Sequence, residues 1–242
     1  MKPFLLIETG DPLPSLRRHG GFGHWIRVAA GLHGREVRHA RVLDGEPLPS
    51  AGGLAGVLVS GSGAMVTERL DWSERTAAWL REAADAGLPL LGICYGHQLL
   101  ADALGGQVDY NPRGREMGTV ELELADAAAT DPLFTGLPST LPAHATHLQT
   151  VLAPPPGATV LARSSLDDCQ AFRWGEATWG VQFHPEFSTG MMRGYIHGRA
   201  DALDREGLCH RSLLKAVRPA PLARRVLRRF VHQARRRAHH GA

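Results

Sequence analysis

The chain has 242 residues, 43% of them hydrophobic, and a formal net charge of only +3. This length suits one α/β domain with modest extensions. No apolar run is long enough to span a bilayer, so we expect no membrane partner. The three cysteines are odd in number and far apart, which argues against a disulfide framework or a zinc site. We therefore expect a reducing, cytoplasmic location.

Short apolar runs alternate with helical segments in the first hundred residues. Strands are expected at residues 4–8, 37–42, 57–60 and 88–93. Asp71 is expected to cap a helix that has Glu74 three residues later and stops at Gly87. This alternation predicts an α/β fold with a mostly parallel central sheet and helices on both faces.

The second half carries shorter β-type runs that are separated by turns. They lie at residues 118–124, 159–163, 170–174 and 178–183. We expect them to add antiparallel strands to the sheet. Because residues 191–203 and the tail look helical, we divide the chain into a domain at 1–190 and a helical C-terminal extension at 191–242, packed on it or projecting from it.

The tail is strongly basic. Its last twenty residues contain seven arginines: Arg224, Arg225, Arg228, Arg229, Arg235, Arg236 and Arg237. Apolar residues, including Val226, Leu227 and Phe230, interrupt them at helical spacing and predict a basic amphipathic helix. A surface for nucleic acid or an acidic partner is one interpretation. A solvated helix face is the favoured one, because nothing elsewhere resembles a nucleic-acid-binding motif.

A strand, a tight Gly-x-Cys-x-Gly turn and a helix are expected at residues 88–106. Such a turn presents its central residue, Cys94, above a parallel sheet. Side chains at Gly92 and Gly96 would obstruct it. The N-terminus of the following helix favours the thiolate, which is the form that attacks carbonyl carbon. The alternative is a buried structural cysteine.

A second motif lies at residues 178–187 and reads Thr-Trp-Gly-Val-Gln-Phe-His-Pro-Glu-Phe. His184 and Glu186 are two apart on an extended segment, so they share one face. Pro185 marks the end of the strand, where loops carry active sites. A base with an orienting carboxylate is what a cysteine nucleophile needs. The alternative is a solvated histidine beside a surface charge.

Together the segments Gly-Ile-Cys-Tyr-Gly-His-Gln (92–98) and Gly-Val-Gln-Phe-His-Pro-Glu (180–186) resemble the class I, triad-type glutamine amidotransferase family. The resemblance covers residues 1–190 and implies a flavodoxin-like fold. It assigns Cys94, His184 and Glu186 as a catalytic triad that hydrolyses the side-chain amide of glutamine through a cysteinyl thioester. The chain also resembles the amidotransferase part of GMP synthase. No metal or cofactor is expected.

The tetrahedral oxyanion of such a reaction needs backbone N–H donors. Turn geometry gives one, the N–H of Tyr95, which follows the nucleophile. The family carries an oxyanion loop after the strand at 57–60, where this chain has Ser-Gly-Ser-Gly without the family's proline. We assign the second donor to Ser62, with Gly61 as the alternative.

Three further sets of residues are candidates for the substrate pocket. The resemblance implies that Gln98 contacts the glutamine and that His144 lies at the edge of the pocket. Their alternatives are a polar residue in a first helical turn and a loop histidine without a role. The polar stretch at 110–118 offers Arg113, Arg115 or Glu116 for the α-amino and α-carboxylate groups, although a plain surface loop fits equally well.

These features predict a glutamine amidotransferase that acts on L-glutamine. Because the chain has no P-loop and no second domain for activating an acceptor, we expect an ammonia-accepting synthetase as partner. The first alternative is a stand-alone γ-glutamyl peptidase or hydrolase with the same triad. The second is a regulatory module that keeps the fold without turnover.

Overall fold

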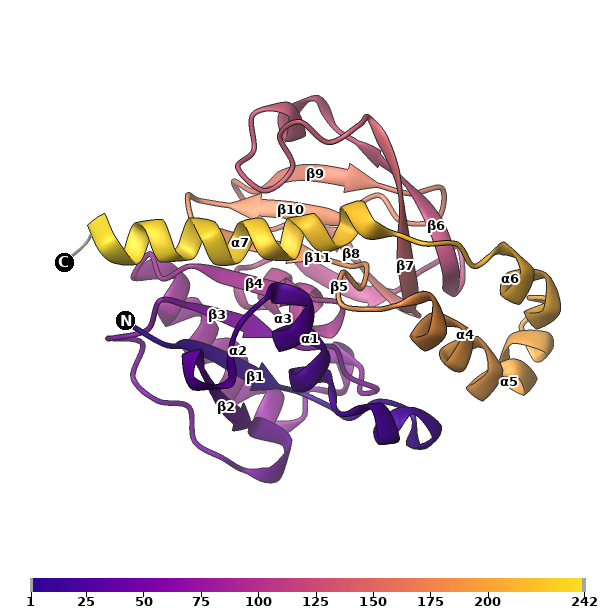
Figure 1. Ribbon diagram of the computed structural model, residues 1–242, viewed down its shortest axis with the longest axis horizontal. Coiled ribbons are helices and arrows are strands. Elements are labelled where there is room, and N and C mark those ends of the chain that lie inside the picture. Colours follow the sequence, from indigo (N-terminus) through magenta and orange to yellow (C-terminus); the bar gives the residue numbers. More distant parts are fainter. Residues whose placement is uncertain (1, 241–242) are drawn as a thin grey trace.

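The computed structural model describes residues 2–240 and is built around a nine-stranded sheet (Figure 1). The strand order is β2-β1-β3-β4-β11-β10-β9-β6-β7. These strands are β1 (Phe4–Glu8), β2 (Val37–Arg41), β3 (Gly56–Val59), β4 (Leu90–Ile93), β6 (Glu116–Leu124), β7 (Thr140–His147), β9 (Thr159–Arg163), β10 (Ala171–Trp174) and β11 (Thr178–Val181). A separate antiparallel pair joins β5 (Gln107–Tyr110) and β8 (Gln149–Ala153).

The sheet changes direction at β11. Strands β2, β1, β3, β4 and β11 pair in parallel, whereas β10, β9, β6 and β7 continue the sheet in antiparallel fashion. This confirms the predicted parallel sheet with antiparallel additions. Strands β5, β7 and β8 were not predicted, and the alternative of a loop at His144 was wrong, since this residue lies on β7. β7 is an edge strand that pairs, among the described strands, only with β6. A proline such as Pro142 is tolerated there, because one side of an edge strand has no partner strand for its N–H groups.

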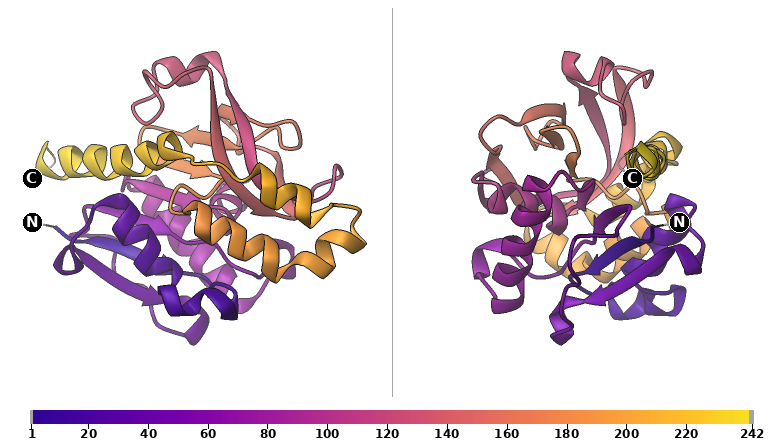
Figure 2. Two further views of the ribbon diagram at one scale, coloured as in Figure 1. Left: turned by 45° about the vertical axis from the view of Figure 1, so that its right-hand side comes forward. Right: turned by 90° about the vertical axis from the view of Figure 1, so that its left-hand side faces the viewer.

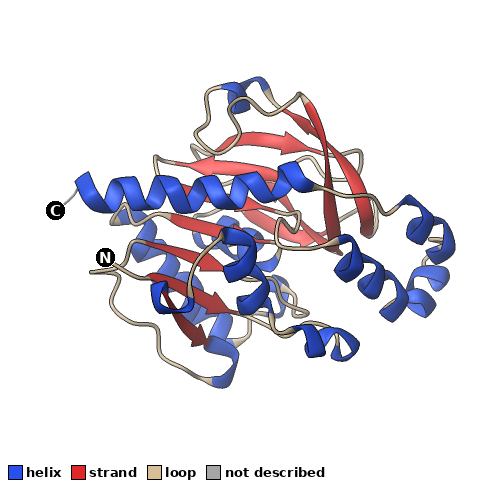
Figure 3. Cartoon of the chain, in the orientation of Figure 1, coloured by secondary structure: helices blue, strands red, loops and turns tan. Residues whose placement is uncertain are grey.

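Helices cover both faces of the sheet, as predicted (Figure 3). Helices α1 and α7 pack on one face and α2 and α3 on the other. The helices are α1 (Phe22–Ala30), α2 (Asp71–Asp85), α3 (Tyr95–Ala103), α4 (Thr189–Gly198), α5 (Ala200–Arg205), α6 (His210–Ala216) and α7 (Pro221–His240). The expectation that Asp71 caps α2 was wrong: Leu70 occupies the N-cap position and Asp71 is the first helical residue. None of the helices in residues 2–240 could cross a bilayer by length and apolar character.

The basic tail forms α7, which lies along the sheet and is seen end-on in the right-hand view of Figure 2. Val226, Leu227 and Phe230 are fully buried against the core, and the Phe230 ring meets Trp179 edge-on at 6.2 Å between centroids. Each such side chain contributes about 1.5–3 kcal/mol of burial energy. The tail is therefore an amphipathic helix that completes one face of the core.

Helices α4, α5 and α6 gather at the end of the molecule where the parallel strands finish (Figure 1). Met192, Tyr195 and Ile196 of α4 are buried with Phe22 and Trp25 of α1 in a third apolar cluster. In open α/β sheets ligands bind outside the carboxyl ends of the strands. These helices therefore wall the region where a site is expected.

Candidate active site

Cys94 lies in the turn between β4 and α3, with a φ of 52° and a ψ of −102°. This positive φ is rare for a residue with a side chain and marks a strained turn. A Cβ on Gly92 would lie 2.2 Å from the carbonyl oxygen of Gly96, and one on Gly96 would lie 2.7 Å from that of Val59. The turn therefore requires both glycines, and it leaves Cys94 at the N-terminus of α3.

The second motif reaches Cys94 because β11 is the parallel neighbour of β4. Gly180 is in register with Gly92, and the N–H of Cys94 donates to the carbonyl of Val181 at 2.9 Å. A Cβ on Gly180 would lie 2.5 Å from the Nδ1 atom of His97. The two motifs are thus packed against each other, and the chain leaving β11 ends at the same edge as the turn.

His184 and Glu186 form a buried pair just beyond β11. The Nδ1 atom of His184 lies 2.8 Å from Oε1 of Glu186, and the Phe187 ring stacks on the imidazole at 4.1 Å between centroids. The backbone N–H of His184 donates to the carbonyl of His144 at 2.7 Å. The buried Nε2 atom has no hydrogen-bond partner among residues 2–240, and the nearby Cys94 acts on this imidazole through its charge.

The electrostatics of this pair favour the charged forms. Burial favours the neutral thiol of Cys94, but the charge and polar contact of His184 and the charge of His147 together outweigh it and keep the pKa of Cys94 below its ordinary 9.0. Burial also disfavours the imidazolium of His184, but the charges of Glu186 and Cys94 raise its pKa to about 10. A thiolate–imidazolium pair is the form of a reactive cysteine.

The backbone N–H groups predicted to bind an oxyanion belong to segments on two sides of Cys94. Tyr95 is the first residue of α3, so its N–H has no carbonyl partner within the helix. A Cβ on Gly61 would lie 3.7 Å from Cβ of Cys94 and 3.2 Å from Cε1 of His184. The loop after β3 thus lies over both side chains, and its next residue, Ser62, lines the cavity at Cys94. The choice between Gly61 and Ser62 stays a prediction.

Cys94 opens onto two adjoining cavities of about 170 and 60 Å³ that share Ser62, Thr146 and Arg199 in their walls. Gln98 lines the smaller one, and its contact with substrate stays a prediction. Its amide nitrogen donates to the carbonyl of Gln149 at 2.7 Å and to Oε1 of Gln182 at 2.8 Å. The carboxamide is therefore held in place, with its oxygen left for a ligand.

Two arginines stand at this cavity, and one of them was missed from the sequence. Arg115 makes a two-pronged ion pair with Glu206, at 2.6 and 2.9 Å. Arg199 is paired with no carboxylate among the described residues, and burial, with the nearby charge of Arg115, lowers the pKa of its guanidinium. Arg199 follows α4, far from either motif, and no local pattern marks it. Arg113 instead pairs with Asp168 at the surface.

The structure places His144 away from the cavities at Cys94. It lies on β7, with its Nδ1 atom 3.2 Å from Oγ1 of Thr119, and it lines a different groove beside α7. Burial and the charge of His184 lower its pKa to about 4. His144 touches the site through its carbonyl, which accepts from His184. Its contact with substrate stays a prediction.

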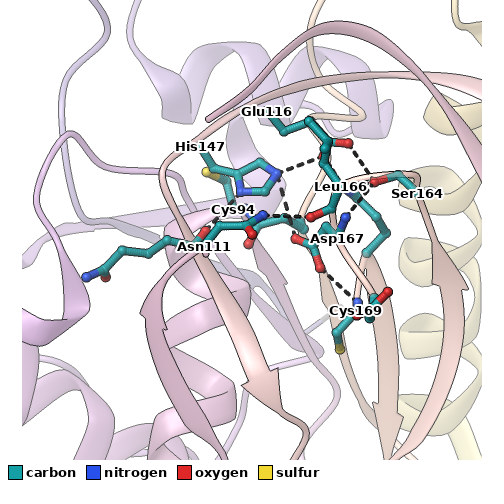
Figure 4. Close-up of polar contacts among 12 residues, drawn as sticks. Cys94, Asn111, Glu116, His147, Ser164, Leu166, Asp167 and Cys169 are labelled. Carbon is teal, nitrogen blue, oxygen red and sulfur yellow. Dashed lines mark hydrogen bonds and ion pairs between the residues drawn. The ribbon is translucent and has the colours of Figure 1, made fainter. Parts of the chain in front are cut away.

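A second histidine–carboxylate cluster lies buried beside Cys94 (Figure 4). His147 places Nδ1 at 2.9 Å from the carbonyl of Gln149 and Nε2 at 2.9 Å from Oε2 of Glu116, with Asp167 at 3.7 Å. Glu116 therefore points inward rather than to a surface loop, and it also accepts from Ser164 and Gln170. This network was not predicted from the sequence.

Within residues 2–240, the side chains of Glu116, His147 and Asp167 form one group whose possible metal-ligand atoms lie within 4.8 Å of one another, close enough to share a metal ion. Nδ1 of His147 faces a backbone carbonyl, which can only accept, so this nitrogen carries a proton. Nε2 faces the carboxyl group of Glu116. Burial lowers the pKa of His147, but Glu116 and Asp167 raise it overall and so favour the protonated imidazole. The cluster is therefore a buried hydrogen-bonded network that places this imidazole next to Cys94.

Comparisons with known proteins agree with this geometry. Residues 36–197 match the family model described as glutamine amidotransferase class-I. A GMP synthase (glutamine-hydrolyzing) of Aeropyrum pernix is 42% identical over 154 residues, which is 62% of this chain but only 28% of that enzyme. Gamma-glutamyl peptidase 4 of Arabidopsis thaliana is 28% identical over 79% of this chain and 78% of its own length.

Solved structures show the same fold. The crystal structure of a glutamine amidotransferase from Thermotoga maritima superposes with a TM-score of 0.75 and 21% identity, over 97% of this chain and 98% of that one. The family model covers more than half of the chain and includes both the turn at Cys94 and the segment at His184. The chain therefore belongs to the class I glutamine amidotransferase family.

Proposed function

We propose that the protein is a glutaminase of the amidotransferase type, with Cys94, His184 and Glu186 as its catalytic triad. One observation supports this most. Nδ1 of His184 is hydrogen-bonded to Glu186, whereas Nε2 has no hydrogen-bond partner among the described residues, and His184 lines the same cavity as Cys94. A base oriented on one side and open on the other is what acyl transfer by a cysteine requires.

The reaction begins when Sγ of Cys94 bonds to the side-chain carbonyl carbon of glutamine. The oxyanion accepts from the N–H of Tyr95 and from the loop at Gly61 or Ser62. Nε2 of His184 gives its proton to the leaving nitrogen, the C–N bond breaks, and ammonia departs from a cysteinyl thioester. His184 then takes a proton from water, the hydroxide attacks the thioester, and glutamate leaves as the thiolate returns.

We assign substrate recognition to Arg199 and Gln98. Arg199 lines both cavities without a carboxylate partner among the described residues, so a substrate carboxylate would complete its pairing. Gln98 presents its carboxamide oxygen from a fixed position. We keep 1–190 as the amidotransferase domain and propose that the extension at 191–242 packs on it and supplies Arg199.

The ammonia requires an acceptor. The matched part of the Aeropyrum GMP synthase is 28% of that enzyme, so most of its length has no counterpart in the match. We propose that a separate synthetase activates the acceptor and receives the ammonia. The thiolate also needs a reducing compartment, and we propose the cytoplasm.

A stand-alone γ-glutamyl peptidase is the second candidate. It is favoured by one observation, the likeness to the Arabidopsis peptidase over nearly four fifths of both chains. Both reactions proceed through the same thioester. They differ in the leaving group, which is ammonia in one case and an amino acid or peptide amine in the other.

The deciding experiment measures ammonia release from L-glutamine and amine release from γ-glutamyl dipeptides by the purified chain, beside the Cys94→Ala variant. We expect glutamine hydrolysis that the variant loses. Turnover of the dipeptides alone would select the peptidase. Turnover that survives in Cys94→Ala, or no thioester detectable by mass spectrometry with either substrate, would refute the mechanism.

A further inference from the structure

A groove of about 390 Å³ lies between the segment that follows His184 and the start of α7, and Cys94 does not line it. His144 and Phe187 line its inner wall, and both touch His184, one through its carbonyl and the other through its stacked ring. Residues of α7 line the outer wall. The first turns of α4 and α7 both lie near β7 at this place in Figure 1. The proposed reaction uses none of this groove.

The groove is strongly electropositive. Arg224, Arg225 and Arg228 line it, and no acidic side chain does. Arg218 and Arg235, farther away along the chain, are paired with carboxylates, and the adjacent Arg229 donates to the backbone carbonyls of Leu133 and Thr135. The three groove arginines form no ion pair among residues 2–240, and the one hydrogen bond found for them runs from Arg228 to a backbone carbonyl. Three arginines therefore line the groove without a paired carboxylate among the described residues.

Two helix N-termini add to this charge. Ser188 and Thr189 at the start of α4 line the groove, and so does Pro221 at the start of α7. A helix N-terminus carries about half a positive charge and favours anions. The first turns of both helices contain no acidic residue that would neutralise it.

One buried polar side chain also points to a ligand. His144 is 1% exposed and still lines the groove. Its Nδ1 atom lies 3.2 Å from Oγ1 of Thr119. Nε2 makes no hydrogen bond to a described residue and is not fully enclosed by protein, so it is open to a ligand or water in the groove. The unpartnered nitrogen belongs to the same groove as the unpaired arginines.

We propose that this groove binds a small phosphorylated ligand, with its phosphoryl group held by Arg224, Arg225 and the first turn of α4. Guanidinium forks match phosphate oxygens in pairs. The cavity is larger than phosphate alone, and Phe187 with Pro219 and Pro221 gives it an apolar wall for a ring or a short carbon chain. A nucleoside monophosphate has both parts. The site is distinct from the substrate cavity. A ligand bound in it would contact His144 and Phe187, which touch His184, the proposed base.

Calorimetric titration of the full chain tests this, with three probes: inorganic phosphate, adenosine 5′-monophosphate, and adenosine without phosphate. The test variant is Arg224→Gln/Arg225→Gln, whose two side chains make no hydrogen bond among the described residues. The matched control is Arg211→Gln/Arg236→Gln, which removes the same charge from exposed positions outside the groove. Thermal unfolding checks that both variants are folded.

We expect saturable binding of the monophosphate, weaker binding of phosphate and none of adenosine. The groove variant should lose about tenfold or more in affinity, since charged hydrogen bonds contribute that much each, and the control should stay within about twofold. Nitrogen-15 spectra should show the Nε2 resonance of His144 shifting in the wild type only. Equal losses in both variants, binding of adenosine alone, an unmoved His144 resonance, or capture of an acidic peptide without phosphate binding would overturn the proposal.

Discussion

Two buried histidine–carboxylate pairs flank Cys94, and they differ in one respect. His184 uses Nδ1 on Glu186 and keeps Nε2 free of nitrogen and oxygen partners. His147 uses both nitrogens, one on Glu116 and one on the carbonyl of Gln149. The first imidazole can therefore give and take a proton at the cavity, whereas both nitrogens of the second are engaged and its carboxylate neighbours favour the cation.

The difference separates two tasks that the same residue types perform. A general acid and base must exchange its proton during the reaction. A fixed cation acts through its charge, and the charge of His147 is one of those that lower the pKa of Cys94. Substitutions in the two pairs should therefore affect different measurements, which makes the comparison testable.

The largest effect is expected from His184→Gln. This variant keeps a polar side chain but removes the proton carrier, so kcat for glutamine should fall about 10³-fold. The matched variant is His147→Gln, which we expect to retain kcat within about tenfold, since its proton does not move. Steady-state kinetics on both proteins decide the matter, and comparable losses in kcat would remove the distinction drawn here.

Glu186→Gln should follow. The amide no longer stabilises the imidazolium, so the pKa of His184, now raised in part by the charge of Glu186, should fall. We expect kcat to drop about 100-fold, within the range of general acid–base effects. The pH profile of kcat should also change in shape. Glu116→Gln serves as the control, and an unchanged profile in Glu186→Gln would mean that Glu186 does not orient the base.

The third effect concerns stability. His147→Gln leaves the carboxylate of Glu116 buried without its cation, and breaking such a pair costs about 3 kcal/mol or more. The double variant His147→Gln/Glu116→Gln removes both charges and should recover part of this loss. Urea unfolding measures the free energies. A single variant as stable as the wild type would show that the pair is not charged.

Much of this architecture could be predicted from local patterns. Strands at 4–8 and 159–163 were predicted with their observed bounds, because apolar β-type runs end there at turn residues. The turn at Cys94 followed from its two glycines. The helix of the basic tail followed from the spacing of its apolar residues. These features are determined by residues close together in the chain, so they can be predicted from local sequence patterns.

Other features depend on contacts between distant segments. Arg199 reaches the cavity only because α4 packs on α1, and no motif surrounds it. His144 and His147 look like one pair at a spacing of three. On a strand that spacing puts them on opposite faces, so one meets the groove and the other the Glu116 network. Strand β7 itself was hidden by Pro142, which an edge position tolerates.

The smallest expected effect is a change of stability with pH that comes from His147. Burial lowers the pKa of His147, but Glu116 and Asp167 outweigh burial and raise it above 6.5. A raised pKa gives stability that is complete below the unfolded-state value near 6.5 and is lost as pH rises through the folded-state value. The stability difference between the wild type and His147→Gln/Glu116→Gln should therefore be largest below about pH 6.5 and shrink above it.

His97 provides the internal check on that measurement. It is buried, and burial lowers its pKa to about 3, so it stays neutral and penalises folding as pH falls below 6.5. Both proteins contain His97, and burial, the main cause of its low pKa, is the same in both, so the difference between their free energies of unfolding removes most of its contribution. The charge of His147 also lowers the pKa of His97, and this smaller part stays in the difference. What remains reports on the Glu116–His147 pair. A difference that grows with rising pH would mean that His147 is neutral when folded, and the contrast with His184 would then lie only in geometry.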